Sequence, residues 1–233
     1  MSRRLLSLGV IAVAFGLFAA APPSGAAMDP NAFINNLGQE GIQSVGPNVP
    51  PRQRLARFRQ LFEADFDVAD IGRFAVGRYW RALNPAQQQE FLQLYREYTV
   101  QAYVEKLGKY GGAQFRVINS EPYGDGVLVN SEAFPPAGNA VRIDWHLVPS
   151  GDGYKVNDVM VNQVSMKVTQ RDEFARIIQN NGGQPSALLA VMRQQLNRGE
   201  GALPTAAPPP AIRQQMPGAG AVPSTAQPVP AMR

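Results

Sequence analysis

The pattern of hydrophobic and polar residues along the chain changes its period near residue 112. Upstream of that point, apolar residues recur every three or four positions, a pattern typical of amphipathic helices. It predicts helices over residues 28–45, 50–66, 67–83 and 84–111. After Gly111 and Gly112 the period becomes two, which predicts strands over residues 113–124, 125–136, 139–150 and 153–166. Helical spacing then returns over residues 169–181 and 185–198.

The third predicted strand alternates most regularly. One of its faces carries Val141, Ile143, Trp145 and Leu147, and the other carries Arg142, Asp144 and His146. Because the links between the last three strands are short, we expect an antiparallel meander. Helices gathered on one side of an antiparallel sheet make an α+β domain. The sequence therefore predicts a single α+β domain, with a sheet of about four strands packed against a helical layer.

The last predicted strand, residues 153–166, does not alternate. Val156 and Met160 share one parity, whereas Val159 and Val161 share the other. A strand with one face in solvent should keep its apolar residues on one side. Apolar residues on both parities therefore predict that both faces of this strand are covered.

The two ends of the chain differ from its middle. Arg3 and Arg4 precede an uninterrupted apolar run over residues 5–21, and small residues follow at positions 24–27. This order predicts a cleaved secretory signal peptide over residues 1–27, with an uncleaved membrane anchor as the alternative. Residues 199–233 are rich in proline and alanine and contain no aromatic residue, which predicts a disordered tail. Residues 28–198 remain as the folded domain.

Composition excludes several classes of function. The chain contains no cysteine, so it has neither disulfides nor thiolate metal sites. The formal net charge is +4, and two of these positive charges lie in the leader at Arg3 and Arg4. The remaining excess is too small to indicate a nucleic-acid-binding surface.

Candidate catalytic groups are few. His146 is the only histidine and shares its strand face with charged residues, so we expect it to be solvated at the surface. Asp67 belongs to an acidic cluster but stands at the expected start of a helix, which favours an N-cap over a calcium ligand. Asp158 could act as a general base within a cavity, or it could bond a neighbouring strand or loop and fix the curvature of the sheet. We expect a protein that is not an enzyme and that holds no cofactor and no metal.

Aromatic residues are concentrated in the third and fourth predicted helices, at Tyr79, Trp80, Tyr95, Tyr98 and Tyr103. Such a stripe most often forms an ordinary hydrophobic core. It also suits a pocket that is apolar inside and hydrated at its mouth. The pattern alone leaves both interpretations open.

Two stretches resemble the MlaC family of toluene-tolerance auxiliary proteins, which serve a periplasmic phospholipid ABC transport system. The first, residues 66–110, contains FDV, IGRF, GRYWR and a regular spacing of tyrosines. The second is YKVNDVMVNQVSMKVTQRDEFARII, which begins at Tyr154. The resemblance extends over roughly residues 29–196 and excludes the tail.

The resemblance implies a periplasmic carrier with a curved, NTF2-like sheet. A phospholipid with two acyl chains would lie between the sheet and the helices, with its headgroup near solvent. The carrier would exchange lipid with an outer-membrane lipoprotein complex and with an inner-membrane MCE-domain protein of an ABC transporter, and so maintain outer-membrane asymmetry. One face of the strand over residues 153–166 would then pack on helices and the other would line the lipid cavity.

The resemblance also suggests which residues contact lipid. From the helices these are Phe74, Tyr79, Tyr98 and Tyr103, and from the sheet Ile143, Trp145, Val159 and Val161. Three cations are candidates for the headgroup rim: Arg73, Arg78 and Arg81.

Three other functions stay open at this point. A hopanoid-associated carrier of the same fold would need only a similar hydrophobic cavity. An NTF2-like enzyme would use Asp158 as its base. A periplasmic adaptor would have a filled core and no ligand.

Overall fold

The structure, a computed structural model, describes residues 28–199. The predicted leader and the predicted tail beyond Gly199 lie outside the described residues. The helical elements are α1 (Pro30–Ser44), α2 (Pro51–Asp65), α3 (Val68–Val76), η1 (Gly77–Ala82), α4 (Pro85–Leu107), η2 (Gly108–Tyr110), α5 (Met166–Asn180) and α6 (Pro185–Arg198). The strands are β1 (Gln114–Tyr123), β2 (Gly126–Phe134), β3 (Val141–Ser150), β4 (Gly153–Val161) and β5 (Val164–Ser165).

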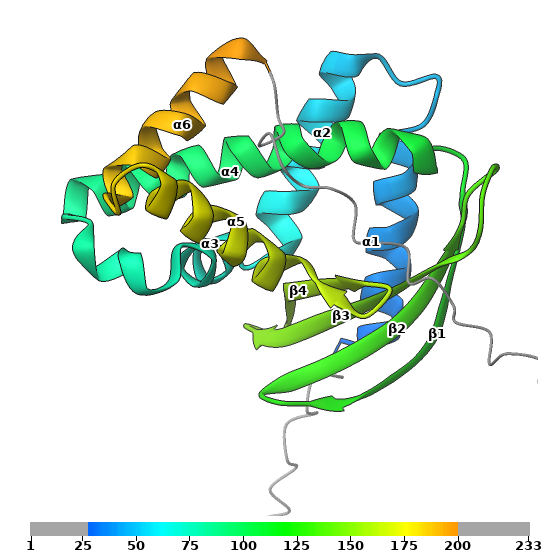
Figure 1. Ribbon diagram of the computed structural model, residues 1–233. Helices are drawn as coiled ribbons and strands as arrows, with labels where there is room; N and C mark the ends of the chain where they lie inside the picture. Colours follow the sequence, from blue (N-terminus) through cyan, green and yellow to red (C-terminus); the bar gives the residue numbers. More distant parts are fainter. Residues whose placement is uncertain (1–27, 200–233) are drawn as a thin grey trace, which may run out of the picture.

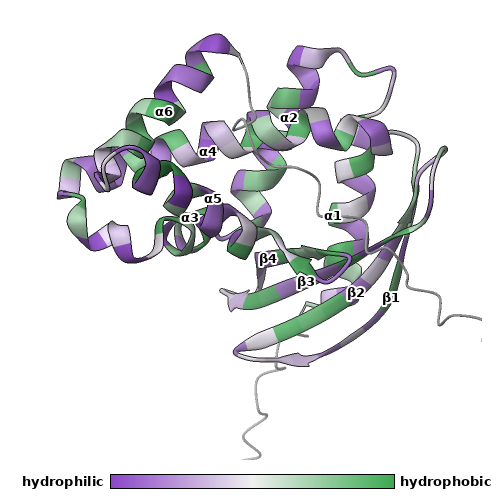
Figure 2. Ribbon diagram, viewed as in Figure 1, coloured by the Kyte–Doolittle hydropathy of each residue, from purple (hydrophilic) through white to green (hydrophobic). Residues whose placement is uncertain are grey.

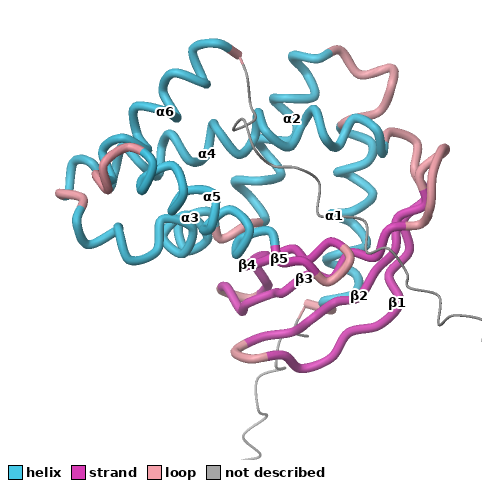
Figure 3. Tube along the Cα trace, in the orientation of Figure 1, coloured by secondary structure: helices cyan, strands magenta, loops and turns pink. Residues whose placement is uncertain are grey.

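A curved sheet forms one side of the molecule and the helices form the other (Figure 1). The strand order is β1-β2-β3-β4-β5, and every neighbouring pair is antiparallel. This arrangement confirms the predicted α+β class and the meander. The two-residue strand β5 was not predicted; it follows a tight turn in which Asn162 and Gln163 both have positive φ, 49° and 67° (Figure 3).

Side-chain caps determine where several helices begin. The Asp67 carboxylate accepts a hydrogen bond from the Asp70 N–H at 3.1 Å, which confirms the predicted N-cap of α3. Ser165 caps α5 in the same way, through the Val168 N–H. Because of this cap, α5 begins at Met166, three residues before the predicted start.

The predicted helix over residues 67–83 is interrupted in the structure. Gly77 has φ 57° and ψ −132°, a conformation that glycine adopts without a steric penalty. The α-helix α3 therefore ends at Val76, and the chain continues as the 3-10 helix η1.

A β-bulge in β4 explains its irregular pattern. The register between β3 and β4 shifts, so that Val156 lies opposite Leu147 while Val159 lies opposite Trp145. The extra residue restores a shared face, since residues directly opposite in an antiparallel pair point to the same side. Val156, Val159 and Val161 therefore all face the helices. The expectation that Val156 shares a face with Met160, opposite to Val159 and Val161, is therefore wrong.

Within residues 28–199 the hydrophobic interior consists of two clusters. The helical cluster includes the buried side chains of Phe91, Tyr95, Phe174, Ile178, Leu188 and Met192. The sheet cluster includes those of Ile34, Phe115, Val129, Leu147 and Val156, where α1 lies against the inner face of the sheet. Phe66 packs against both clusters. Hydrophobic and hydrophilic residues follow one another along the strands that contribute to the sheet cluster (Figure 2).

Candidate functional site

A cavity of about 230 Å³ lies between the inner face of the sheet and the helices. Its sheet wall is made by Phe115, Ala133, Val141, Ile143, Trp145, Val159 and Val161. Its helical wall includes Leu37, Ile42, Phe58, Leu61, Phe62, Ile71, Tyr103, Leu107 and Tyr110. The polar members of the lining are Thr99, Asp158, Lys167 and Gln170; the others are apolar or aromatic, so the cavity suits a hydrophobic ligand.

The exposure of the lining residues locates the mouth of the cavity. Phe62, Ile71 and Ala133 are buried members of the lining. Partly exposed lining residues occur on several walls, and one group of them lies at the end of α4, the start of β3, the end of β4 and the start of α5, at Tyr103, Leu107, Tyr110, Val141, Val161 and Met166. We take this partly exposed rim as the mouth.

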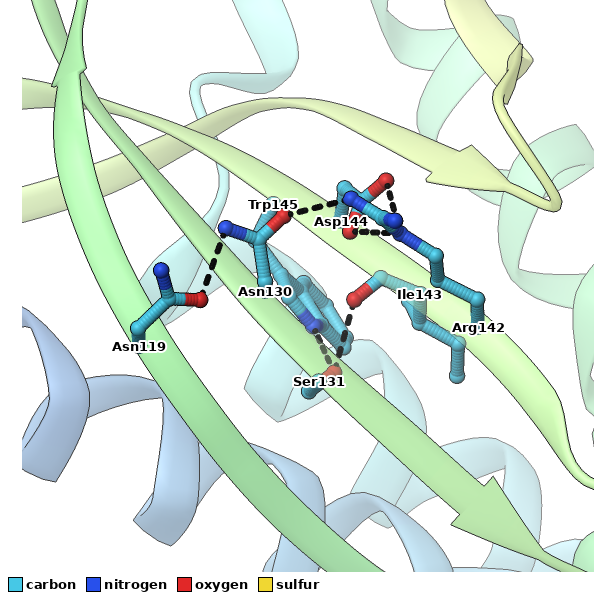
Figure 4. A network of polar contacts seen from close by, with 7 residues as sticks. All are labelled: Asn119, Asn130, Ser131, Arg142, Ile143, Asp144 and Trp145. Atoms are coloured by element: carbon cyan, nitrogen blue, oxygen red, sulfur yellow. Dashed lines mark hydrogen bonds and ion pairs between the residues drawn. The ribbon is translucent and has the colours of Figure 1, made fainter.

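Two polar atoms of the aromatic lining, Trp145 Nε1 and the Tyr95 hydroxyl, are bonded within the protein. The Trp145 Nε1–H donates to Ser131 Oγ at 2.9 Å, and Ser131 Oγ donates to the Ile143 carbonyl at 2.8 Å (Figure 4). The Tyr95 hydroxyl donates to Gln170 Oε1 at 2.7 Å, and burial raises its pKa. Because these donors are satisfied, the rings present an apolar surface to the cavity.

A polar network on the outer face of the sheet joins β1, β2 and β3 behind this wall. Asn130 Nδ2 donates to Asn119 Oδ1 at 3.1 Å, and Arg142 Nη2 donates to Asn130 Oδ1 at 3.0 Å (Figure 4). Arg142 Nε also donates to Asp144, whose side chain is 5% exposed. The network connects three strands on the side of the sheet away from the cavity.

Asp158 holds the start of α5 against β4. One carboxylate oxygen accepts from Ser165 Oγ at 2.5 Å, and the other accepts from the backbone N–H groups of Val159 and Lys167, at 2.8 and 3.2 Å. The side chain lies at the cavity lining, and the residue is 8% exposed. These contacts favour the structural interpretation of Asp158 over a general base, because both oxygens are occupied by bonds that position a helix.

The change Asp158→Asn is expected to lower the free energy of unfolding by about 1–3 kcal/mol, since an amide has one acceptor atom and cannot replace all three bonds. Urea denaturation of the mature protein measures this loss. A variant as stable as the parent would contradict the structural role and return attention to Asp158 as a reactive group.

Five of the eight predicted lipid-contact residues line the cavity together. These are Tyr103 from α4, Ile143 and Trp145 from β3, and Val159 and Val161 from β4. Contact with a lipid remains a prediction for each of them. Burial raises the pKa of the Tyr103 hydroxyl to about 12, and the charges of Glu173 and Asp158 act in the same direction. The Tyr103 hydroxyl therefore stays protonated at neutral pH and can donate a hydrogen bond.

The other three predicted contacts lie outside the lining. Tyr98 is 3% exposed within the helical cluster, where Tyr79 also packs as a partly buried residue. The Phe74 ring lies beneath the cations of Lys167 and Arg171, each 4.9 Å from its centroid. Helix α3 packs against α4 and α5, so its apolar face serves the helical cluster and contributes Ile71 to the cavity.

The predicted headgroup arginines also lie away from the lining. Arg73 is placed over the Trp80 ring at 5.8 Å, and Arg78 lies over the Tyr79 ring at 4.9 Å. Arg81 is exposed near the end of η1. Arg73 belongs to α3, Arg78 and Arg81 belong to η1, and none of the three lines the cavity.

Sequence reasoning assigned no ligand contact to α1 or α2, although both helices line the cavity. The apolar residues of α2 at helical spacing were a usable signal, because Phe58, Leu61 and Phe62 all reach the lining. In α1 the signal was a pair of glycines on one helix face, Gly38 and Gly41, where another element or a ligand can approach the backbone closely. Gly38 and Gly41 both line the cavity, but they meet different surroundings.

Alanine substitutions at these two glycines are expected to have opposite effects. A Cβ at Gly38 meets Cδ1 and Cζ of Phe115 at 2.6 Å, and Phe115 is held edge-on by Trp145, so Gly38→Ala should destabilise by about 1–3 kcal/mol. A Cβ at Gly41 meets no atom within 4 Å, so Gly41→Ala should stabilise by up to about 1 kcal/mol through helix propensity. Urea midpoints of the two variants test the pair, and shifts of the same sign would contradict it.

His146 is covered rather than solvated, contrary to expectation. Its side chain is 12% exposed because the Tyr123 ring packs edge-on against it at 5.1 Å. His146 Nε2 lies 3.3 Å from Asp125 Oδ1. Within residues 28–199, no three His, Cys, Asp or Glu side chains are grouped so that they could hold a metal ion. No helix in the same range has the length and hydropathy needed to cross a membrane.

Comparisons with known proteins identify a family and a similar solved structure. A family model described as MlaC protein matches residues 43–194. The fold is also similar to that of a phospholipid-binding protein from Ralstonia solanacearum, solved in complex with a phospholipid. The two chains share 19% sequence identity with a TM-score of 0.62, and the alignment covers 74% of this chain and 99% of the other.

Proposed function

The chain belongs to the MlaC family, and from that membership we propose that it is a periplasmic phospholipid carrier. It takes up lipid from one membrane system and delivers it to another. Its partners are an outer-membrane lipoprotein complex and an inner-membrane MCE-domain protein of an ABC transporter, and its role is to maintain outer-membrane lipid asymmetry. The predicted signal peptide, residues 1–27, supports the periplasmic location.

The observation that carries the proposal is the apolar cavity between the sheet and the helices. At about 0.8 kcal/mol per methylene, two acyl chains of roughly 15 methylenes each would cost on the order of 20 kcal/mol if left in water. A carrier must therefore enclose most of that surface. The bonded polar atoms of Trp145 and Tyr95 leave walls suited to this task. The fold shared with a phospholipid-bound protein agrees with the proposal.

The test is mass spectrometry of the organic-soluble material that co-purifies with the mature protein, prepared without detergent. About one two-chain phospholipid per protein is the expected result. A hopanoid would replace the phospholipid as cargo and support the related carrier. A folded protein without any lipid would favour the adaptor with a filled core and overturn the proposal.

A further inference from the structure

The mouth of the cavity carries cations that the predicted headgroup rim did not include. Lys106 in the last turn of α4 lies over the ring of Tyr103, with Nζ 5.3 Å from the ring centroid. Lys109 in η2 lies over the ring of Tyr110 at the same distance. Both tyrosines line the cavity, and both lysines are exposed. Each ammonium group is thus held at the edge of a wall that a ligand would touch.

No ion pair between described side chains neutralises these lysines. Among the side chains that the structure describes, neither lysine has a carboxylate within 4.0 Å. Glu173 on α5 interacts with Lys106 at longer range, and burial raises the pKa of this glutamate. An anion that approaches the mouth would therefore meet two cations that keep most of their charge available.

A third cation lies beside the same segment. Arg54 Nη1 is 3.8 Å from the position that a Cβ atom would take at Gly108. Gly108 lies between Lys106 and Lys109 in the sequence. The Arg54 guanidinium is fixed there because Nε donates to the Val49 carbonyl at 2.7 Å and Nη2 donates to the Pro47 carbonyl at 3.3 Å. These two hydrogen bonds hold the guanidinium in place, so that Arg54 adds a fixed positive charge near the mouth.

The carboxyl end of α4 accounts for only part of this arrangement. A lysine in the last turn of a helix is favoured by the helix dipole whether or not a ligand is present. The dipole does not explain why both ammonium groups lie over rings of the cavity wall.

We propose that Lys106 and Lys109 form an anion subsite at the mouth, so that the protein retains phospholipids with a net negative headgroup in preference to zwitterionic ones. This inference rests on the proposed carrier function and specifies its cargo. The acyl chains provide affinity for any phospholipid, and the lysines distinguish headgroups. An ammonium-bearing headgroup places a positive charge beside the lysines, which disfavours it.

The experiment offers delipidated mature protein to vesicles with equal amounts of phosphatidylglycerol and phosphatidylethanolamine, and then measures the retained lipids by mass spectrometry. The parent protein is expected to enrich phosphatidylglycerol about fivefold for each contributing lysine at low salt. High salt should reduce the enrichment, since exposed charges are screened. The double variant Lys106→Gln with Lys109→Gln should lose it while retaining the same total lipid.

The matched control removes two other exposed charges, by Arg52→Gln with Arg57→Gln on α2, and should keep the enrichment. Enrichment that is absent in the parent, or that survives in the lysine variant, would overturn the subsite. Loss of enrichment in Arg78→Gln with Arg81→Gln instead would move the rim to η1 and also overturn it. If the protein binds its full amount of lipid without headgroup selectivity, only the anion subsite is contradicted. If no variant binds lipid, the proposed carrier function is contradicted as well.

Discussion

The change Val161→Glu is expected to reduce the amount of retained lipid about tenfold or more while leaving the secondary structure intact. Val161 lies at the end of β4, opposite Ile143, and lines the cavity at its mouth. A carboxylate there would either lose its hydration when an acyl chain enters or keep water in the cavity, and the cost of burying such a charge is several kcal/mol. Because Val161 is partly exposed, the ligand-free protein can hydrate the new charge.

Lipid per protein, measured by mass spectrometry after detergent-free purification, gives the result, and far-UV circular dichroism checks the fold. The control is Val168→Glu, which adds the same charge at a residue that is 36% exposed and outside the cavity lining. Position 168 is the third residue of α5, where a glutamate suits the Ser165 cap. If Val161→Glu carries as much lipid as the control, the end of β4 does not contact the cargo.

The change Phe174→Ala should lower the free energy of unfolding by about 3–5 kcal/mol, the range for removal of a fully buried phenyl ring. Phe174 is fully buried at the centre of the helical cluster, and its ring centroid lies 6.2 Å from those of Phe91, Tyr95 and Tyr98. The residues around it come from α4, so collapse into the space would have to move a 23-residue helix. If the surrounding side chains do not fill the space, a void remains and the loss of stability is large.

Urea denaturation at equilibrium measures the change, with the slope compared between variants to confirm a single transition. Tyr123→Ala is the control, because it removes an aromatic ring that is 48% exposed and should cost about 1 kcal/mol or less. Since Phe174 lies outside the cavity lining, the folded variant should still carry lipid. A loss no greater than that of the control would mean that the aromatic cluster repacks without a void.

Periodicity and helix caps were sufficient to predict the class of the fold. Asp67, Pro85 and the paired glycines at 111 and 112 mark boundaries through local chemistry, so their effect can be read without tertiary information. The bulge in β4 could not be predicted in this way. Its signal, apolar residues on both parities, is equally compatible with a strand covered on both faces, and only the register against β3 separates the two.

The candidate site was predicted in part for a related reason. A strand face is defined by alternation, so placing Ile143 and Trp145 on one wall also determined Val159 and Val161 once the register was known. The apolar face of a helix does not indicate in this way which element packs against it. The stripe that contains Tyr98 predicted burial correctly, but sequence spacing does not say whether a buried face meets the sheet or another helix.

The helical cluster and the sheet cluster are two separate hydrophobic cores, and Phe66 packs against both. The cavity is lined by residues of both clusters, so it forms a seam, that is, an interface between two packed cores. A seam can widen while both bodies stay packed, whereas a hole inside one core can widen only if that core loosens. Opening the cavity for a bulky ligand therefore does not require the free energy that global unfolding requires. A protein built in this way can load and unload through many cycles without populating the unfolded chain that proteases cleave.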